Sequence, residues 1–109
     1  MKTIQIAKDF TKFPGTRLKS TGKGSGEEFR EKFLLPALEA GEPVTIELDG
    51  TVGYPPSFLD EAFGGLLRLG YTLADVDKVF TVKAGPAFEI YARLIQEYLA
   101  EEEARRKAG

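Results

Sequence analysis

The chain of 109 residues contains no cysteine, no histidine and no tryptophan. The absence of cysteine excludes disulfides and metal sites built on thiolates. The absence of histidine removes the commonest general base, metal ligand and pH switch. An enzyme of this composition would have to work with carboxylates, lysines, tyrosines and hydroxyls. We therefore expect a protein that is not an enzyme and that holds no cofactor or metal.

A long hydrophobic run and a strong positive charge are also missing. No apolar segment approaches the roughly 20 residues that span a bilayer, and the N-terminus lacks the apolar core of a signal peptide. The net charge of −2 argues against nucleic acid as the main partner. We expect a single cytoplasmic domain over residues 1–109 that binds neither membranes nor nucleic acid. Its oligomeric state stays open.

The charges that are present are unevenly placed along the chain. Residues 1–26 hold six bases and one acid, a net charge of +5, whereas residues 27–62 hold two bases and nine acids, a net charge of −7. Two interpretations fit this distribution. The basic segment either forms a site for an anion or pairs with the acidic segment inside the molecule.

Apolar and polar residues alternate in three segments, which predicts half-buried strands at residues 2–7, 44–48 and 79–82. A further short strand is predicted within residues 10–18, after a turn at Pro14 and Gly15. Because no strand is apolar throughout, helices should cover mainly one face of the sheet. The predicted fold class is a small α/β domain with a mixed sheet of four to five strands.

Apolar residues at helical spacing predict three helices. The first begins at a capping box of Ser25 and Glu28 and ends at Gly41, with a kink or break near Leu35 because of Pro36. The other two begin at residues 55–57 and 85–86, and a single helical turn is predicted within residues 72–78. Residues from about 100 to 109 should form a solvated helical tail, in which glutamates pair with bases four residues later.

The start of the second helix is the first candidate site. The simplest interpretation of Ser57 is an N-cap, with Asp60 completing a variant capping box. The functional interpretation is a phosphoacceptor. A phosphate at Ser57 would meet the positive end of the helix dipole, but Asp60 and Glu61 would repel it, so its addition would act as a switch.

Two other features of this helix have more than one interpretation. Gly64 and Gly65 allow either close packing against a neighbour or a flat surface on which a partner docks. The carboxylates of Asp60, Glu61 and Asp49 are the residues that a carboxylate-only metal enzyme would use. Because no base or nucleophile accompanies them, we do not favour catalysis.

The glycine-rich loop at residues 22–26 is the second candidate site. It enters the first predicted helix and follows several bases, so it would bind a small anion or a nucleotide through backbone amides and lysines. It fits neither the P-loop nor the GxGxxG pattern, and a merely flexible loop is the simpler interpretation. The anion-binding residues in this hypothesis are Arg17, Lys19, Lys23, Gly24, Ser25 and Gly26.

Three motifs resemble those of a STAS-like domain family of unknown function, which is related to the STAS domains of anti-sigma factor antagonists. They are Ser-Gly-Glu-Glu-Phe-Arg at residues 25–30, Leu-Leu-Pro-Ala-Leu at 34–38 and Ser-Phe-Leu-Asp-Glu-Ala-Phe-Gly-Gly-Leu at 57–66. The resemblance covers nearly the whole chain. The antagonists carry an Asp-Ser-Ser/Thr-Gly run, phosphorylated by a partner kinase, where Ser57 falls close to the acceptor position. A second register places Glu61 there, as a permanent mimic of the phosphorylated state.

The resemblance implies a non-enzymatic regulatory module that docks a regulatory protein, such as a kinase with a GHKL-type ATP-binding fold. Phosphorylation of the antagonists blocks this docking. The surface implied here is the loop at residues 51–56, Ser57 and the following helix. The partner-binding residues in this hypothesis are Tyr54, Ser57, Asp60, Glu61, Gly64, Gly65 and Arg68.

Overall fold

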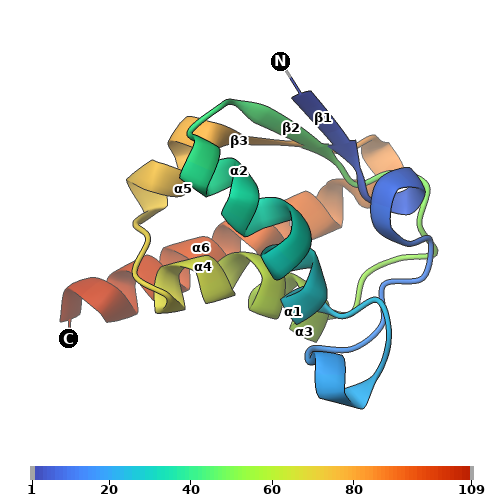
Figure 1. The fold of residues 1–109 in the computed structure, drawn as a ribbon, viewed down its shortest axis with the longest axis horizontal. Coiled ribbons are helices and arrows are strands. Elements are labelled where there is room, and N and C mark those ends of the chain that lie inside the picture. The colour runs from blue at the N-terminus through green and yellow to red at the C-terminus, as the bar shows by residue number, and fades with distance from the viewer. Residues whose placement is uncertain (1, 109) are drawn as a thin grey trace.

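The computed structural model describes residues 2–108, in which three parallel strands form one sheet (Figure 1). The strands are β1 (Lys2–Gln5), β2 (Val44–Glu47) and β3 (Phe80–Lys83), in the order β1-β2-β3. Ile4 lies opposite Ile46, which lies opposite Val82. The prediction of a mixed sheet with four to five strands was therefore wrong for the described part of the chain, although the α/β class is confirmed.

The strand predicted within residues 10–18 is absent from the structure. The chain leaves β1 through a π-helical turn, η1 (Ile6–Phe10), and then runs as a loop whose backbone bonds to other loops. The Gly15 N–H donates to the Gly24 carbonyl at 3.0 Å, and the Lys12 carbonyl accepts from the Val52 N–H at 2.9 Å. These partners satisfy the backbone groups that a strand would have used in a ladder.

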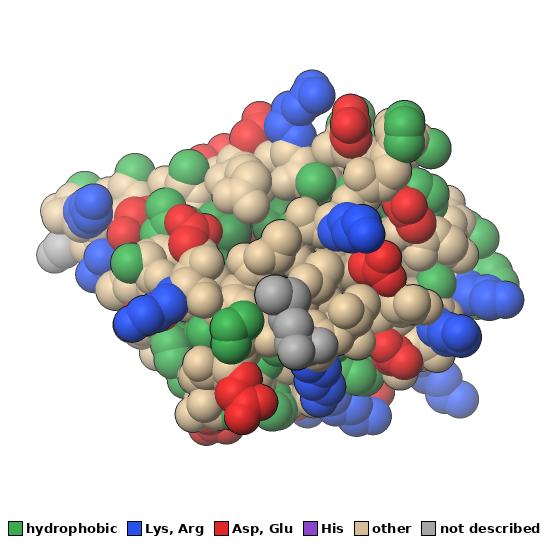
Figure 2. Space-filling view, turned by 90° about the horizontal axis from the view of Figure 1, so that it is seen from above, with side chains coloured by type: hydrophobic (Ala, Val, Ile, Leu, Met, Phe, Trp, Pro, Cys, Tyr) green, Lys and Arg blue, Asp and Glu red, His purple; other side chains and the backbone are tan. Residues whose placement is uncertain are grey.

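The helical segments lie beneath the sheet in Figure 1. The strands are parallel and lie in the order of the sequence, so both crossover connections move in the same direction along the sheet. Because such connections are right-handed, both place their helices on the same face of the sheet. Ile4, Val44, Ile46 and Phe80 point into the core on that side and are buried. Figure 2 looks down on the opposite face, whose centre is mostly backbone and uncharged polar atoms.

The first long helical segment comprises α1 (Gly26–Phe29), the π-helical η3 (Arg30–Leu34) and α2 (Leu35–Ala40). The interruption predicted near Leu35 is a change of hydrogen-bond pattern rather than a break, because the chain stays helical through Pro36. The π-helical bonding immediately before Pro36 accommodates the missing N–H. Gly41, in the left-handed conformation at φ 71°, ends the helix as predicted.

The second segment is the centre of the helical layer. It comprises α3 (Pro56–Leu59), η4 (Asp60–Gly64) and α4 (Gly65–Arg68), and it packs between the first segment and α6 (Glu89–Ala108). Its core side chains are fully or almost fully buried: Phe58, Leu59, Ala62, Phe63, Leu66 and Leu67. Two short 3₁₀ turns, η2 (Lys19–Thr21) and η5 (Pro86–Phe88), and α5 (Leu73–Val79) complete the elements.

The longest helix, α6, extends to Ala108, and its last part is not simply solvated as predicted. Glu102 is only 5% exposed, because Arg68 of α4 and Arg105 both bond to its carboxylate. The pairs that form join Arg105 to Glu102 and Arg106 to Glu103, three residues apart rather than the predicted four. None of the helices within residues 2–108 is long and apolar enough to cross a membrane.

Candidate functional site

Ser57 is the second residue of its helix and not the N-cap that the sequence predicted. The N-cap is Pro55, and Pro56 occupies the first helical position, where its fixed φ and missing N–H are favourable. The Ser57 side chain is half-buried and has no hydrogen-bond partner among residues 2–108. The predicted capping box with Asp60 is therefore absent.

Ser25 provides a matched comparison, because it is the N-cap that the sequence predicted. Its buried hydroxyl accepts the Glu28 N–H at 3.0 Å. Ser25→Ala is expected to lower the free energy of unfolding by about 1 kcal/mol, the usual contribution of an N-cap. Ser57→Ala should change it by less than about 0.5 kcal/mol, as for a surface substitution. Urea unfolding of both variants tests this, and equal losses would contradict the assignment of the caps.

The acidic start of the helix is paired with arginines from other elements. Arg17 Nη1 lies 2.9 Å from Asp60 Oδ2 and 3.2 Å from Glu61 Oε1. Arg68 Nη1 lies 3.4 Å from Asp60 Oδ1 and 2.8 Å from Glu102 Oε2. The hydrogen bond to Asp60 raises the pKa of the Arg17 guanidinium. Burial lowers the pKa of Arg68, but the hydrogen bond to Glu102 and the charge of Asp60 outweigh it, so that this pKa is also raised. These contacts support the interpretation that the basic and acidic segments pair within the molecule.

Arg30 closes this group of ion pairs from the first helical segment. Its side chain is 9% exposed, and Nη1 lies 2.8 Å from Glu61 Oε2. Burial raises the pKa of Glu61, but the hydrogen bonds from Arg30 and Arg17 outweigh it, so that this pKa lies below its ordinary value. Glu61 is thus directed inward, away from the exposed position that a mimic of a phosphoserine would need.

The glycine pair is a packing site and not the exposed flat surface that the docking hypothesis required. Gly64 and Gly65 are both buried. A Cβ at Gly65 would overlap the guanidinium of Arg30, and one at Gly64 would lie 2.8 Å from Asp60 Oδ1 and 3.3 Å from Arg68 Nη1. The two glycines therefore allow the arginines to lie directly on the helix backbone.

Tyr54 is also buried, at 5% exposure, and so does not lie on a surface as predicted. Its hydroxyl donates to the Leu48 carbonyl at 2.7 Å, and its ring packs edge-on against Tyr91 at a centroid distance of 5.2 Å. Burial raises the pKa of Tyr54 to about 12, which keeps its hydroxyl a donor at neutral pH. Tyr54 holds the loop after β2 in place.

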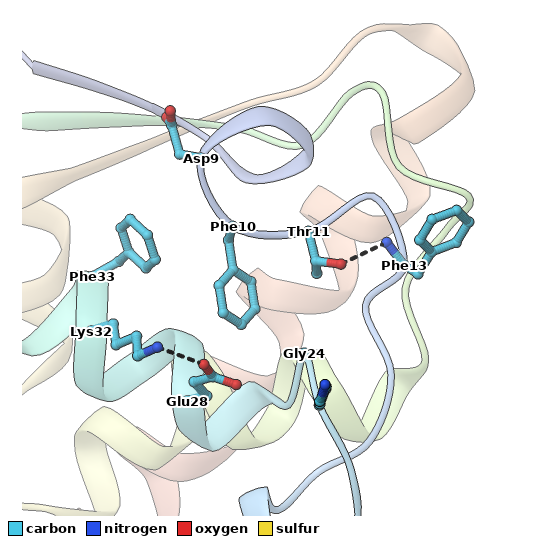
Figure 3. Close-up of a pocket in the computed structure, with 9 residues that line it drawn as sticks. Asp9, Phe10, Thr11, Phe13, Gly24, Glu28, Lys32 and Phe33 are labelled. Atoms are coloured by element: carbon cyan, nitrogen blue, oxygen red, sulfur yellow. Dashed lines mark hydrogen bonds and ion pairs between the residues drawn. The ribbon is translucent and has the colours of Figure 1, made fainter.

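Two large hydrophobic side chains are exposed on neighbouring loops. Val52 belongs to the loop at residues 51–56 that the sequence analysis implied, whereas the sequence reasoning missed Phe13. Phe13 is 67% exposed and Val52 is 73% exposed. The bond between the Val52 N–H and the Lys12 carbonyl joins the two loops, and Figure 3 shows Phe13 beside the loop that follows β2. This loop leads into α3, whose first two residues are the exposed Pro56 and the half-buried Ser57. We call Phe13, Val52, Pro56 and Ser57 the loop-tip surface.

Three N–H groups where the glycine-rich loop enters the first helix, including that of Gly26 from the predicted anion site, already have acceptors within the molecule. The Gly26 N–H donates to the Thr16 carbonyl at 2.9 Å, the Glu27 N–H to the Arg17 carbonyl at 3.0 Å, and the Glu28 N–H to Ser25 Oγ. Ser25 and Gly26 are buried. The Thr16 and Arg17 carbonyls and the Ser25 hydroxyl thus occupy these N–H groups at the helix N-terminus.

The lysines predicted for the same anion site differ in their surroundings. Lys19 Nζ bonds to Glu31 Oε1 at 2.5 Å, and this hydrogen bond raises the pKa of the Lys19 ammonium group. Lys23 has no ion-pair partner within the described part of the chain. With Arg17 held by Asp60, Lys23 is the member of the predicted cationic set that remains available.

A cavity of about 690 Å³ opens beside this loop, between η1 and the first helical segment (Figure 3). Phe10 and Phe33 form its apolar wall, with ring centroids 5.7 Å apart and their planes nearly perpendicular. Lys32 lies below them, bonded to Glu28 at 2.8 Å. The remaining lining residues are Asp9, Thr11, Phe13, Lys23 and Gly24.

The carboxylates considered for a metal are not brought together. Asp60 and Glu61 face arginines, whereas Asp49 accepts the Gly85 N–H at 2.9 Å beyond the end of β3. Among residues 2–108 no group of three or more acidic side chains is arranged to hold a metal ion.

Residues 25–85 match the family described as STAS-like domain of unknown function (DUF4325). This match spans more than half of the chain, and the protein belongs to that family. No curated protein and no solved structure matches the chain. The match includes Ser57, Val52 and the paired helix start, whereas Phe13 and the whole of α6 lie outside it.

Proposed function

We propose that this STAS-like domain is a non-enzymatic regulatory module that docks a protein partner through the loop-tip surface. Family membership supports a regulatory module of the STAS type. The observation that carries the docking proposal is the exposure of Phe13 and Val52 on two joined loops. Exposed hydrophobic side chains that gather at one place are typical of protein–protein contacts.

The corrected surface differs from the one that the sequence implied. Tyr54, Gly64 and Gly65 are buried and therefore do not form part of it. Asp60 and Glu61 are paired, so they offer little free charge to a partner. Of the predicted surface, Val52, Pro56 and Arg68 are exposed and Ser57 is half-buried, whereas Thr51 and Tyr54 of the loop are buried. Phe13 adds an exposed aromatic side chain beside Val52.

The proposed partner is a kinase-like or other ATP-binding regulatory protein, by analogy with the anti-sigma factor antagonists. Ser57 is the proposed point of control. A phosphate there would add a charge of about −1.5 to −2 one helical turn before Asp60 and Glu61. It would compete with both carboxylates for Arg17, whose Nη1 bonds to each of them. Phosphorylation would therefore add charge to the loop-tip surface and weaken docking.

The test is affinity capture with the wild-type chain, followed by measurement of the dissociation constant for the captured ATP-binding protein. The double variant Phe13→Ser, Val52→Ser is expected to weaken binding by about 30-fold or more, the loss typical of a central hydrophobic contact. Leu69→Ser is the matched control. Leu69 is 58% exposed but lies at the far end of the same helical segment.

Three outcomes decide the proposal. Equal affinity of the wild type and the double variant would remove the loop-tip surface from the interface. Loss of binding by Leu69→Ser as well would indicate a general effect and not a local surface. Ser57→Asp is expected to weaken binding to a similar extent, and retention of full affinity would discard Ser57 as the point of control while leaving the surface in place.

A further inference from the structure

We propose that the cavity of Figure 3 binds a small molecule that carries an aromatic ring and an anionic group. The cavity volume of about 690 Å³ lies within the range of ligand pockets, which is about 300–1,000 Å³. The cavity shares Phe13 with the loop-tip surface, but the side chains that carry this inference are Phe10, Phe33 and Lys23, which the docking proposal does not use.

The apolar wall is preorganised by aromatic packing behind it. Phe10 and Phe33 both contact Phe29, at centroid distances of 5.4 and 5.3 Å. Phe29 is fully buried, whereas Phe10 and Phe33 are only partly covered. Figure 3 shows both of these rings projecting into the cavity. A flat ring from a ligand would find faces and edges already fixed in position, which lowers the entropic cost of stacking.

The polar end of the cavity carries one available positive charge, that of Lys23. Lys32 is neutralised by Glu28, and the Asp9 carboxylate accepts the Gln5 N–H at 2.8 Å on the opposite side of the cavity. The left-handed conformation of Gly24, at φ 69°, and the bond from Gly15 fix the loop that bears Lys23. An anionic group near Lys23 would therefore meet a cation that is not already paired.

A second hollow continues the cavity past Lys23. It has a volume of about 640 Å³ and shares Lys23, Glu28 and Lys32 with the first. Its other lining residues are polar or small: Lys19, Ser20, Thr21, Gly22 and Glu31. From the first hollow to the second, the lining thus changes from aromatic (Phe10 and Phe33) through cationic (Lys23) to polar (residues 19–22). This order fits a ligand whose ring lies against Phe10 and Phe33 and whose anionic, hydrophilic end points toward residues 19–22.

The experiment is an NMR titration of the full chain with phenyl phosphate, which combines a ring and a phosphate. Saturable shifts of the Gly24 amide and of the Phe33 ring are expected at millimolar concentrations. Lys23→Ala is expected to weaken binding by about tenfold, as for loss of a charge-assisted contact. Lys12→Ala is the matched control, because Lys12 is an exposed lysine of the same segment that does not line the cavity.

Further arms define the ligand chemistry. Inorganic phosphate is expected to bind much more weakly than phenyl phosphate, and equal affinities would overturn the role of the ring. AMP with the same dependence on Lys23 would identify a nucleotide as the source of ring and phosphate; binding of phenyl phosphate alone would identify a smaller aromatic anion. Absence of saturable binding by both compounds, or equal affinity of Lys23→Ala and the wild type, would overturn the proposal. Because no protein partner is present, failure of the docking proposal does not affect this result.

Discussion

Gly26→Ala is expected to lower the free energy of unfolding by about 3 kcal/mol, at the upper end of the usual cost of overpacking. Gly26 is buried where the first helical segment crosses the second. A Cβ there would overlap the Phe58 carbonyl oxygen and lie 3.1 Å from Glu61 Cβ and 3.2 Å from Ala62 N. Two of these three obstacles are backbone atoms, so the helices themselves would have to move apart.

Equilibrium urea unfolding of the wild type and of Gly26→Ala measures this loss. Gly22→Ala is the matched control in the same loop, because its Cβ would meet only Thr16 Cγ2 at an ordinary 3.4 Å. The control should stay within about 0.5 kcal/mol of the wild type. A Gly26→Ala variant of wild-type stability would show that the two helices do not approach as closely as the structure has them.

The sequence predicted those elements whose patterns are local. Alternation located the three strands that form, and helical spacing located the helices over 26–40 and 56–68. The strand predicted within residues 10–18 failed because a turn at Pro14 and Gly15 does not determine which backbone groups the chain meets afterwards. In the structure these groups meet Gly24 and Val52, which are distant in sequence. Hydrogen bonds between residues so far apart in the chain cannot be predicted from the residues of one segment alone.

The start of the second helix shows the same limit at one residue. A serine before an apolar stripe is typical of an N-cap, but Pro56 already fixes the first helical position and moves the cap to Pro55. The Ser57 hydroxyl is therefore left without a capping role. A proline immediately before a candidate cap is a signal that sequence reasoning could have used.

Exposure was the property that sequence reasoning predicted least well at the site. The sequence could place Gly64 and Gly65 on a helix but not show what covers them: Arg30, from a segment 35 residues earlier, covers Gly65, and the side chains of Asp60, Arg68 and Glu102 cover Gly64. Nothing in the motif around Arg30 separates an arginine that covers a neighbouring helix from one that is solvated. The charge distribution did contain the needed hint, because a basic N-terminal segment and an acidic middle segment were equally consistent with internal pairing.

That pairing carries the second large expected effect. Arg30→Ala is expected to lower the free energy of unfolding by about 3 kcal/mol, the lower end of the cost of breaking a buried ion pair. The lower end applies because Arg17 still pairs with Glu61 and because Glu61 is 15% exposed. Lys32→Ala is the control, since Lys32 and Glu28 form an exposed pair worth at most about 1 kcal/mol.

The dependence on pH separates the charge of Glu61 from the packing of Arg30. The pKa of Glu61 lies below its ordinary value, so the folded state favours the ionised carboxylate more strongly than the unfolded chain does. The stability that it contributes is complete above the ordinary glutamate pKa of about 4.3 and is lost as the pH falls through the lower pKa of the folded state. The wild type should therefore lose stability over this interval to a greater extent than Glu61→Gln, in urea unfolding at a series of pH values. Parallel losses in the two proteins would mean that Arg30 stabilises the fold through its packing on Gly65 rather than through the charge of Glu61.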